Sequence, residues 1–302
     1  MQDSGSEPFL HRGTIRGVPR PARLIPRREM LETAGLGAVT LAAPRHALGT
    51  PAADGTKLVV QRLNWAGIKL EAGDSALFID ATTADPNSPE EKVTPTTTRP
   101  RSYALITHAH GDHFDAALLR NLLGEKGYLV CHRDSVPFID LRALRVSPVD
   151  LWEPIFIPRG GSDFVAFAVP AVDGWGLSQV SWVIEAAGRR LIHCGDTLWH
   201  GRLTDIGLAY GPFDVAFLPI NGARQNVGRF KDQGIPGVLT PDQAVAAAQA
   251  LRANLVVPIH YGNPSPPDYV EALNAEEAFL GLARQQHVDV RSMRPGDLLR
   301  LP

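Results

Sequence analysis

Thr107-His108-Ala109-His110-Gly111-Asp112-His113 is the stretch of this sequence that decides the fold. It holds three histidines and one aspartate within six positions, and it follows an apolar run that reads as a buried strand ending in a loop. Side chains two positions apart on a strand point to the same face, so His108 and His110 are expected to project together. The turn at Gly111 directs Asp112 and His113 toward a second point nearby. Imidazole and carboxylate together suit Zn²⁺ and similar divalent metals, and two adjacent groups indicate two ions.

This stretch resembles the H-x-H-x-D-H signature of the metallo-β-lactamase superfamily. Two later segments match the same family in its usual order: 191–197 ends in Gly-Asp-Thr, and 256–262 contains a single histidine. The resemblance runs from about Lys57 to the C-terminus. It implies an α/β fold, the αββα sandwich, in which Asp196 bridges two metal ions and His260 is the last ligand.

One position departs from the family pattern. The sequence is most similar to the branch of ascorbate-6-phosphate lactonase and N-acyl-phosphatidylethanolamine phospholipase D, where a third histidine of the first metal site follows a Pro-Ala pair. Here Pro170-Ala171 is followed by Val172 and Asp173, and no histidine occurs between His132 and His193. Asp173 is therefore the predicted replacement ligand, which would favour oxygen-preferring Mn²⁺ or Fe²⁺ over Zn²⁺. The alternative is a weak or empty first site and one metal on Asp112, His113, Asp196 and His260.

The predicted metal ligands are thus His108, His110, Asp112, His113, Asp173, Asp196 and His260, holding one or two Zn²⁺ ions. A bound divalent metal lowers the pKa of water from about 15.7 to near 7, so the expected reaction is hydrolysis of an ester, lactone, amide or phosphodiester. Asp112 and Asp196 are the candidate catalytic groups, because either carboxylate would orient the attacking water or return a proton. The alternative is an exported metal-binding accessory protein with a degenerate first site and no turnover.

The N-terminal segment resembles a twin-arginine export signal. Arg27-Arg28 is followed by an uncharged run from Thr33 to Ala43 that is too short and too rich in Gly and Ala to span a bilayer. Small residues at Ala47 and Gly49 suit a signal peptidase. The expected organisation is a signal peptide over 1–49 and a hydrolase domain over 50–302, with the export machinery as a partner and a periplasmic or secreted mature protein.

Composition bears on the expected partners, on membrane spans and on the state of the cysteines. The chain has a net charge of −2. Residues 1–49 hold seven arginines and four acidic residues, a net charge of +3, so the rest of the chain carries −2 − 3 = −5. A modestly acidic domain gives no electrostatic reason to expect nucleic acid as a partner. The expected partner is a small-molecule substrate. After processing, no other run is long and apolar enough to predict a stable membrane span. The two cysteines, Cys131 and Cys194, end apolar runs and are expected to be buried thiols, with an oxidised pair as the alternative.

Hydrophobic periodicity predicts strands followed by helices, as a layered α/β domain requires. The expected strands are 58–63, 68–70, 76–79, 164–169, 180–185 and 190–192, and the expected helices are 115–123, 241–251 and 270–286. The second helix carries Thr240 as N-cap, Pro241 at its first position and Gln243 at the capping-box position. Among lesser candidates, His193 is expected to pack away from the site, while His200 and Tyr261 are possible substrate contacts.

Overall fold

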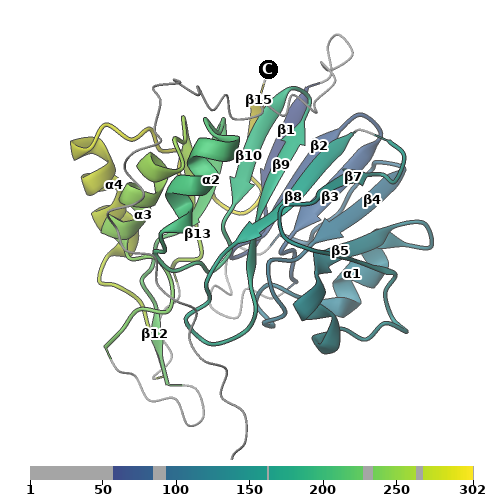
Figure 1. The fold of residues 1–302 in the computed structure, drawn as a ribbon, viewed down its shortest axis with the longest axis horizontal. Helices are drawn as coiled ribbons and strands as arrows, with labels where there is room; N and C mark the ends of the chain where they lie inside the picture. Colours follow the sequence, from purple (N-terminus) through teal and green to yellow (C-terminus); the bar gives the residue numbers. More distant parts are fainter. Residues whose placement is uncertain (1–56, 84–92, 162, 227–233, 263–267, 302) are drawn as a thin grey trace, which may run out of the picture. The chain divides into compact units, whose positions relative to one another are not determined.

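The computed structural model of the chain describes residues 57–83, 93–161, 163–226, 234–262 and 268–301. The predicted signal peptide and its boundary at residue 50 lie outside the described residues. In the described part, two β-sheets face each other and helices cover their outer faces (Figure 1).

The first sheet has the order β15-β1-β2-β3-β4-β5-β6 over the described residues. Its strands are β15 (Leu298–Leu301), β1 (Leu58–Arg62), β2 (Ile68–Ala72), β3 (Ser75–Ile79), β4 (Arg101–Leu105), β5 (Tyr128–His132) and β6 (Val146–Val149). The strands from β15 to β3 pair antiparallel, whereas β3, β4, β5 and β6 pair parallel. Parallel neighbours need crossover connections, and α1 (Ala116–Leu123) and the 3₁₀ helix η1 (Arg133–Phe138) lie in two of them.

The second sheet has the order β13-β11-β10-β9-β8-β7 over the same described ranges. Its strands are β7 (Pro154–Ile157), β8 (Phe164–Pro170), β9 (Val180–Ala186), β10 (Arg189–His193), β11 (Val215–Pro219) and β13 (Val256–Ile259). The strands β10, β11 and β13 are parallel, and α2 (Arg202–Tyr210) and α3 (Pro241–Ala250) lie in their crossovers. The helix α4 (Ala275–Gln285) follows, and β12 (Arg224–Gln225) pairs with β14 (Tyr269–Val270) in a short ribbon.

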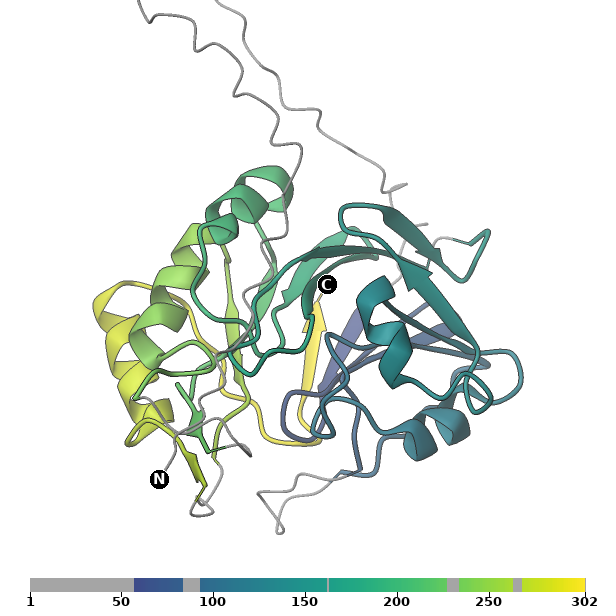
Figure 2. The same ribbon diagram turned by 60° about the horizontal axis from the view of Figure 1, so that its bottom comes forward.

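Alternating side chains explain why the two sheets and the helices form layers. On β9, Val180, Trp182 and Ile184 enter the core between the sheets, whereas Val183 joins the core under α2, α3 and α4. On the other outer face, leucines of α1 cover the first sheet. Figure 2 shows α1 on one side of the sandwich and the green and yellow helices α2, α3 and α4 on the other. The predicted αββα sandwich is confirmed.

Most predicted elements occur within one or two residues of their expected bounds. The capping box of α3 is present, because the Thr240 hydroxyl accepts from the Gln243 backbone N–H and the Gln243 side chain accepts from the Thr240 N–H. The helix expected from Val270 is wrong at its start: Val270 lies in β14, and Asn274 adopts φ +50° before α4 begins. A β-branched residue in the β12–β14 ribbon explains this difference.

The helix α2 was not predicted. It is short, and Gly201 at its N-cap makes no side-chain capping bond, so neither periodicity nor capping marks it in the sequence. The two cysteines are buried and free. Cys131 packs under α1, whereas Cys194 packs on the opposite outer face, under α2 to α4, so the two thiols lie in different layers and form no pair.

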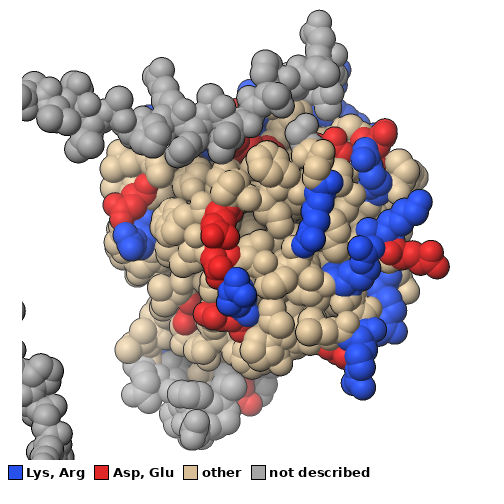
Figure 3. All heavy atoms as spheres, turned by 45° about the vertical axis from the view of Figure 1, so that its right-hand side comes forward, with Lys and Arg blue, Asp and Glu red and all other residues tan. Residues whose placement is uncertain are grey.

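The surface mixes both charge signs. Figure 3 shows basic and acidic side chains beside one another on a largely uncharged face. Several are paired there or elsewhere on the surface, such as Arg133 with Asp150 at 2.8 Å and Arg101 with Asp163 at 3.5 Å. In the described ranges, no helix is long and apolar enough to cross a membrane.

Candidate metal centre

All seven predicted ligands lie at one edge of the sandwich, where strands of both sheets end. The H-x-H-x-D-H stretch follows β4, Asp196 follows β10, and His260 follows β13. Parallel strands bring their carboxyl ends to the same edge of a sheet, and the ligand-bearing ends of the two sheets meet, so residues as distant in sequence as His108 and His260 lie together. The seven side chains form two adjacent groups: site 1 (His108, His110 and Asp173) and site 2 (Asp112, His113, Asp196 and His260). Within each group the potential ligand atoms lie within 4.8 Å of one another.

Site 2 is built around one oxygen of Asp196. Its Oδ1 lies 2.9 Å from the Nε2 of His113 and 3.0 Å from the Nε2 of His260. The Oδ2 of Asp112 lies 3.5 Å and 3.6 Å from the same two nitrogens. The two imidazole nitrogens and Asp196 Oδ1 are buried and have no hydrogen-bond partner in the described part of the chain. Buried polar atoms are rarely left without a partner, so this convergence fits a divalent cation held by two nitrogens and two oxygens.

Site 1 is less fully formed. The Nε2 of His108 lies 2.8 Å from the Nδ1 of His110, so the two rings hydrogen-bond to each other. Asp173 Oδ2 is 3.8 Å from the same His110 nitrogen. A ligated metal needs an unprotonated nitrogen from each ring, so the hydrogen bond between these two histidines would have to break when a cation binds through the same nitrogens.

Asp196 joins the two sites. Its Oδ1 faces site 2, while its Oδ2 lies 3.9 Å from the Nε2 of His108 in site 1. The carboxylate is 1% exposed and follows a tight turn at Gly195, which has φ +57°. A Cβ at Gly195 would come within 2.8 Å of the Thr107 Cβ, so glycine is required for the β10 loop to approach the β4 loop this closely. This close approach places one carboxylate between both groups of ligands.

Asp173 caps a turn and also faces site 1. Its Oδ1 accepts a hydrogen bond from the Trp175 N–H at 2.9 Å, and its Oδ2 accepts from the Leu177 N–H at 3.1 Å, as in a turn-capping residue. Its carboxylate nevertheless faces His110 and does not point away from the site. Burial raises the pKa of Asp173.

Sequence reasoning did not identify the residues that contact the second ring nitrogen of His113 and of His260. Asp80 is fully buried at the end of β3; its Oδ2 lies 2.9 Å from the Nδ1 of His113 and accepts from the Thr107 hydroxyl at 2.7 Å. Asn221 Oδ1 lies 3.4 Å from the Nδ1 of His260. Such partners fix which ring nitrogen faces the metal. A sequence signal for Asp80 was an aspartate placed directly after the apolar run 76–79.

The electrostatics differ between the histidines of the two sites. Burial lowers the pKa of His108 to about 3, with His113 adding to the effect, so this imidazole is neutral. Burial also disfavours charge on His260, but Asp196 and Asp112 outweigh it and raise its pKa to about 9. The same two aspartates, with Asp80, raise the pKa of His113 well above its usual value against the effect of burial. In the metal-free protein, protons on site 2 histidines therefore neutralise carboxylates that a divalent cation would otherwise neutralise.

The histidines and the tyrosine that were lesser candidates, His193, His200 and Tyr261, lie outside both groups of ligands. The His193 Nε2–H donates to the Ala66 carbonyl oxygen at 2.8 Å, and His193 belongs to neither group, as expected. The Tyr261 hydroxyl donates to Glu276 at 3.1 Å. His200 is half-buried, and its ring nitrogens make no hydrogen bond within the described residues.

Comparison with known proteins places this geometry in a family. The family described as "Beta-lactamase superfamily domain" matches residues 75–261, a segment that contains every candidate ligand. The chain belongs to the beta-lactamase superfamily. It is similar to a UPF0173 metal-dependent hydrolase of Thermus thermophilus, 30% identical over 65% of this chain and 80% of that protein, and to one of Rubrobacter xylanophilus, 31% identical over 75% and 89%. This member of the superfamily is an enzyme of the metal-dependent hydrolase class.

Solved structures agree on the fold. A metallo hydrolase, Igni18, from Ignicoccus hospitalis superposes with a TM-score of 0.63 at 22% identity, covering 82% of this chain and 99% of that one. The diiron β-hydroxylase CmlA from Streptomyces venezuelae superposes with a TM-score of 0.62 at 17% identity, covering 81% and 54%. Because the second protein is named for iron and hydroxylation, the shared fold by itself fixes neither the metal nor the reaction.

Proposed function

We propose that this superfamily member is a two-metal hydrolase that activates water to cleave an ester, lactone, amide or phosphodiester bond. The observation that carries the proposal is the division of the Asp196 carboxylate, with Oδ1 directed to site 2 and Oδ2 to site 1. A carboxylate shared in this way suits two neighbouring cations, which together polarise a scissile oxygen and make water nucleophilic near neutral pH.

The proposed roles of the two catalytic aspartates differ because their exposure differs. The Asp112 side chain is 28% exposed, whereas that of Asp196 is 1% exposed. Burial disfavours the charged form of Asp112, but His113 and His260 outweigh it and hold its pKa well below the usual value. Asp112 is therefore an ionised carboxylate at the open side of site 2, where it would orient the attacking water or return a proton to the leaving group. Asp196 holds the two sites together.

The proposal also covers which metal each site would bind. Site 2 offers two imidazole nitrogens and two carboxylates, a set that suits Zn²⁺. Site 1 offers two imidazoles and the Asp173 carboxylate, and it accommodates Zn²⁺, Mn²⁺ or Fe²⁺.

The test combines metal analysis with a substrate panel. Purified protein loaded separately with Zn²⁺, Mn²⁺ and Fe²⁺ is assayed for bound metal per chain and for turnover of nitrophenyl esters, lactones and phosphodiesters. Two ions per chain with chelator-sensitive turnover support the proposal. One ion without turnover of any substrate supports the accessory-protein alternative. Asp205→Asn, an exposed aspartate of α2, is the matched control for Asp196→Asn.

We also propose that the enzyme reaches the periplasm or the medium by the twin-arginine route, on the strength of Arg27-Arg28 and the weakly apolar run that follows. Lysine at both positions should leave the precursor in the cytoplasm, as detected by fractionation. The control changes Arg20 and Arg23 to lysine in the same tail. Equal export of the unaltered protein, the Arg27-Arg28 variant and the control variant would contradict the proposal.

A further inference from the structure

Trp65 touches two candidate ligands of site 2 at once. Its indole Nε1–H donates to Asp112 Oδ2 at 3.0 Å. Its ring lies 4.3 Å from the His260 ring, centroid to centroid, at a tilt of 51°. The Asp112 oxygen that accepts this hydrogen bond is the one directed at both site 2 imidazoles. Trp65 is 2% exposed, so it supports the ligands from the protein side.

Several buried side chains hydrogen-bond to the backbone of the loop that carries Trp65. It connects β1 to β2, and the buried guanidinium of Arg62 donates to the carbonyls of Leu63 and Gly67, each at 2.9 Å, and to that of Trp65. The His193 ring bonds the Ala66 carbonyl at 2.8 Å. A Cβ at Gly67 would lie 2.9 Å from the Asp80 carbonyl oxygen, so this loop packs directly against the residue that supports His113. Trp65 itself adopts φ +50°, a conformation that this set of contacts maintains.

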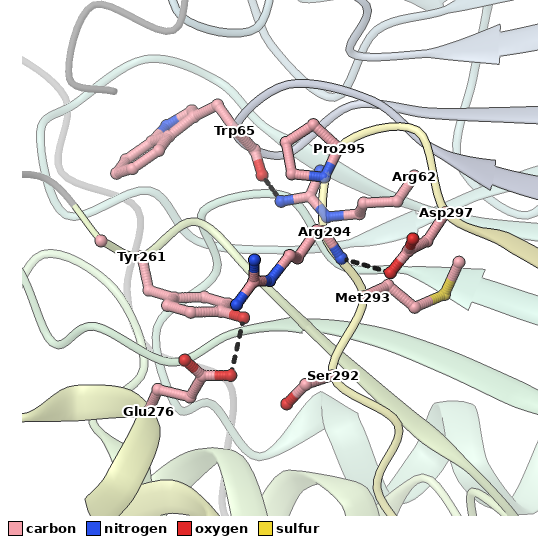
Figure 4. Close-up of a pocket in the computed structure, with 10 residues that line it drawn as sticks. Arg62, Trp65, Tyr261, Glu276, Ser292, Met293, Arg294, Pro295 and Asp297 are labelled. Atoms are coloured by element: carbon pink, nitrogen blue, oxygen red, sulfur yellow. Dashed lines mark hydrogen bonds between the residues drawn. The ribbon is translucent and has the colours of Figure 1, made fainter. Parts of the chain in front are cut away.

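A cavity of about 460 Å³ borders Trp65. Figure 4 shows part of its lining: the Arg62 guanidinium bonds the Trp65 carbonyl, and the Arg294 side chain extends toward the Tyr261 ring. The Trp65 indole contacts both Asp112 and His260. A smaller side chain at position 65 would therefore enlarge this cavity toward site 2.

We propose that Trp65 is a positioning residue of the metal centre, whose N–H selects the Asp112 oxygen that faces the cation and whose ring orients the His260 imidazole. This inference rests on the proposed two-metal function. Hydrogen bonds to metal ligands of this kind alter metal affinity by about 10–100-fold when they are removed.

The test separates the N–H from the ring. Trp65→Phe keeps an aromatic ring and loses the donor, and Trp65→Ala removes both. Trp199→Phe is the matched control, because Trp199 is 46% exposed and makes no hydrogen bond to a candidate ligand. Each protein is titrated with Co²⁺, and affinity and the visible absorption spectrum of the bound ion are recorded. Thermal unfolding without metal shows whether each variant folds.

Trp65→Phe should bind the site 2 ion about tenfold more weakly and shift its spectrum, while Trp199→Phe matches the unaltered protein. Free indole, which fits the enlarged cavity, should restore part of the affinity lost in Trp65→Ala. Unchanged affinity and spectrum in Trp65→Phe would overturn the inference while leaving the two-metal function intact. If the unaltered protein binds no metal, the proposed function fails and the inference fails with it.

Discussion

Site 1 and site 2 share Asp196 but differ in how completely the protein prepares them. In site 2, His113 and His260 are each supported from behind, by Asp80 and Asn221, and their Nε2 atoms converge on one oxygen. In site 1, the two histidines bond to each other, the His110 side chain is 29% exposed, and both oxygens of Asp173 accept backbone hydrogen bonds.

This difference indicates that the two sites bind metal by different routes. Site 2 keeps its ligand geometry without metal, because each ring has a fixed partner on its other nitrogen. Site 1 has to rearrange the His108–His110 contact first. We therefore expect site 2 to bind its ion more tightly and site 1 to depend more strongly on metal supply.

The largest expected effect comes from the shared ligand. Asp196→Ala should abolish binding at both sites and lower kcat/KM by more than about a hundredfold, because it removes an atom from each ligand set. Metal analysis and steady-state assays of the refolded variant measure this. Retention of one full equivalent of metal would show that the sites do not share this carboxylate.

Asp173→Ala tests site 1 alone. It should lose one metal per chain and leave site 2 filled, whereas Asp173→His should keep two ions and shift the preference of site 1 from Mn²⁺ or Fe²⁺ toward Zn²⁺. Competition titrations followed by metal analysis measure both. If Asp173→Ala keeps two ions and full turnover, Asp173 only caps the Trp175–Leu177 turn, and its nearness to His110 has no role in binding.

Asp80→Asn tests the support of site 2. The amide keeps the shape of the side chain but removes the charge beside His113, so we expect about 10–100-fold weaker metal binding at site 2 and little change at site 1. Asp163→Asn is the control, because Asp163 accepts a hydrogen bond from Ser75 at the start of β3, the opposite end of that strand from Asp80. Equal losses at both sites would mean that Asp80 stabilises the whole edge of the sandwich and not one ligand.

The smallest expected effect is a pH dependence confined to site 2. Because the folded-state pKa of His260 is raised to about 9 in the metal-free protein, its protonated ring stabilises the fold fully below the unfolded value near 6.5. That contribution should be lost as the pH rises through about 9. Metal-loaded protein should not show this loss, because the cation replaces the proton. Thermal unfolding from pH 6 to 10, with and without chelator, measures the difference; parallel curves would contradict it.

The sequence predicted the candidate ligands but not the residues that support them. His108, His110, Asp112 and His113 were predicted from local spacing, whereas Asp173, Asp196 and His260 were predicted from the resemblance to the superfamily; the structure brings all seven together in two groups. Asp80, Asn221 and Trp65 were given no role in the site, because none of them belongs to the ligand pattern. Their roles come from contacts across 33, 39 and 47 positions of sequence.

The sequence by itself determined a layered α/β domain and the residue types of the ligands, because periodicity and residue chemistry are local properties. The resemblance to the superfamily added the αββα sandwich and the position of Asp173 among the family's histidines. Only the tertiary structure decided that Asp173 both caps a turn and faces His110, and that the two Asp196 oxygens face different sites. The direction of a side chain depends on the segments packed around it, and here these come from both sheets.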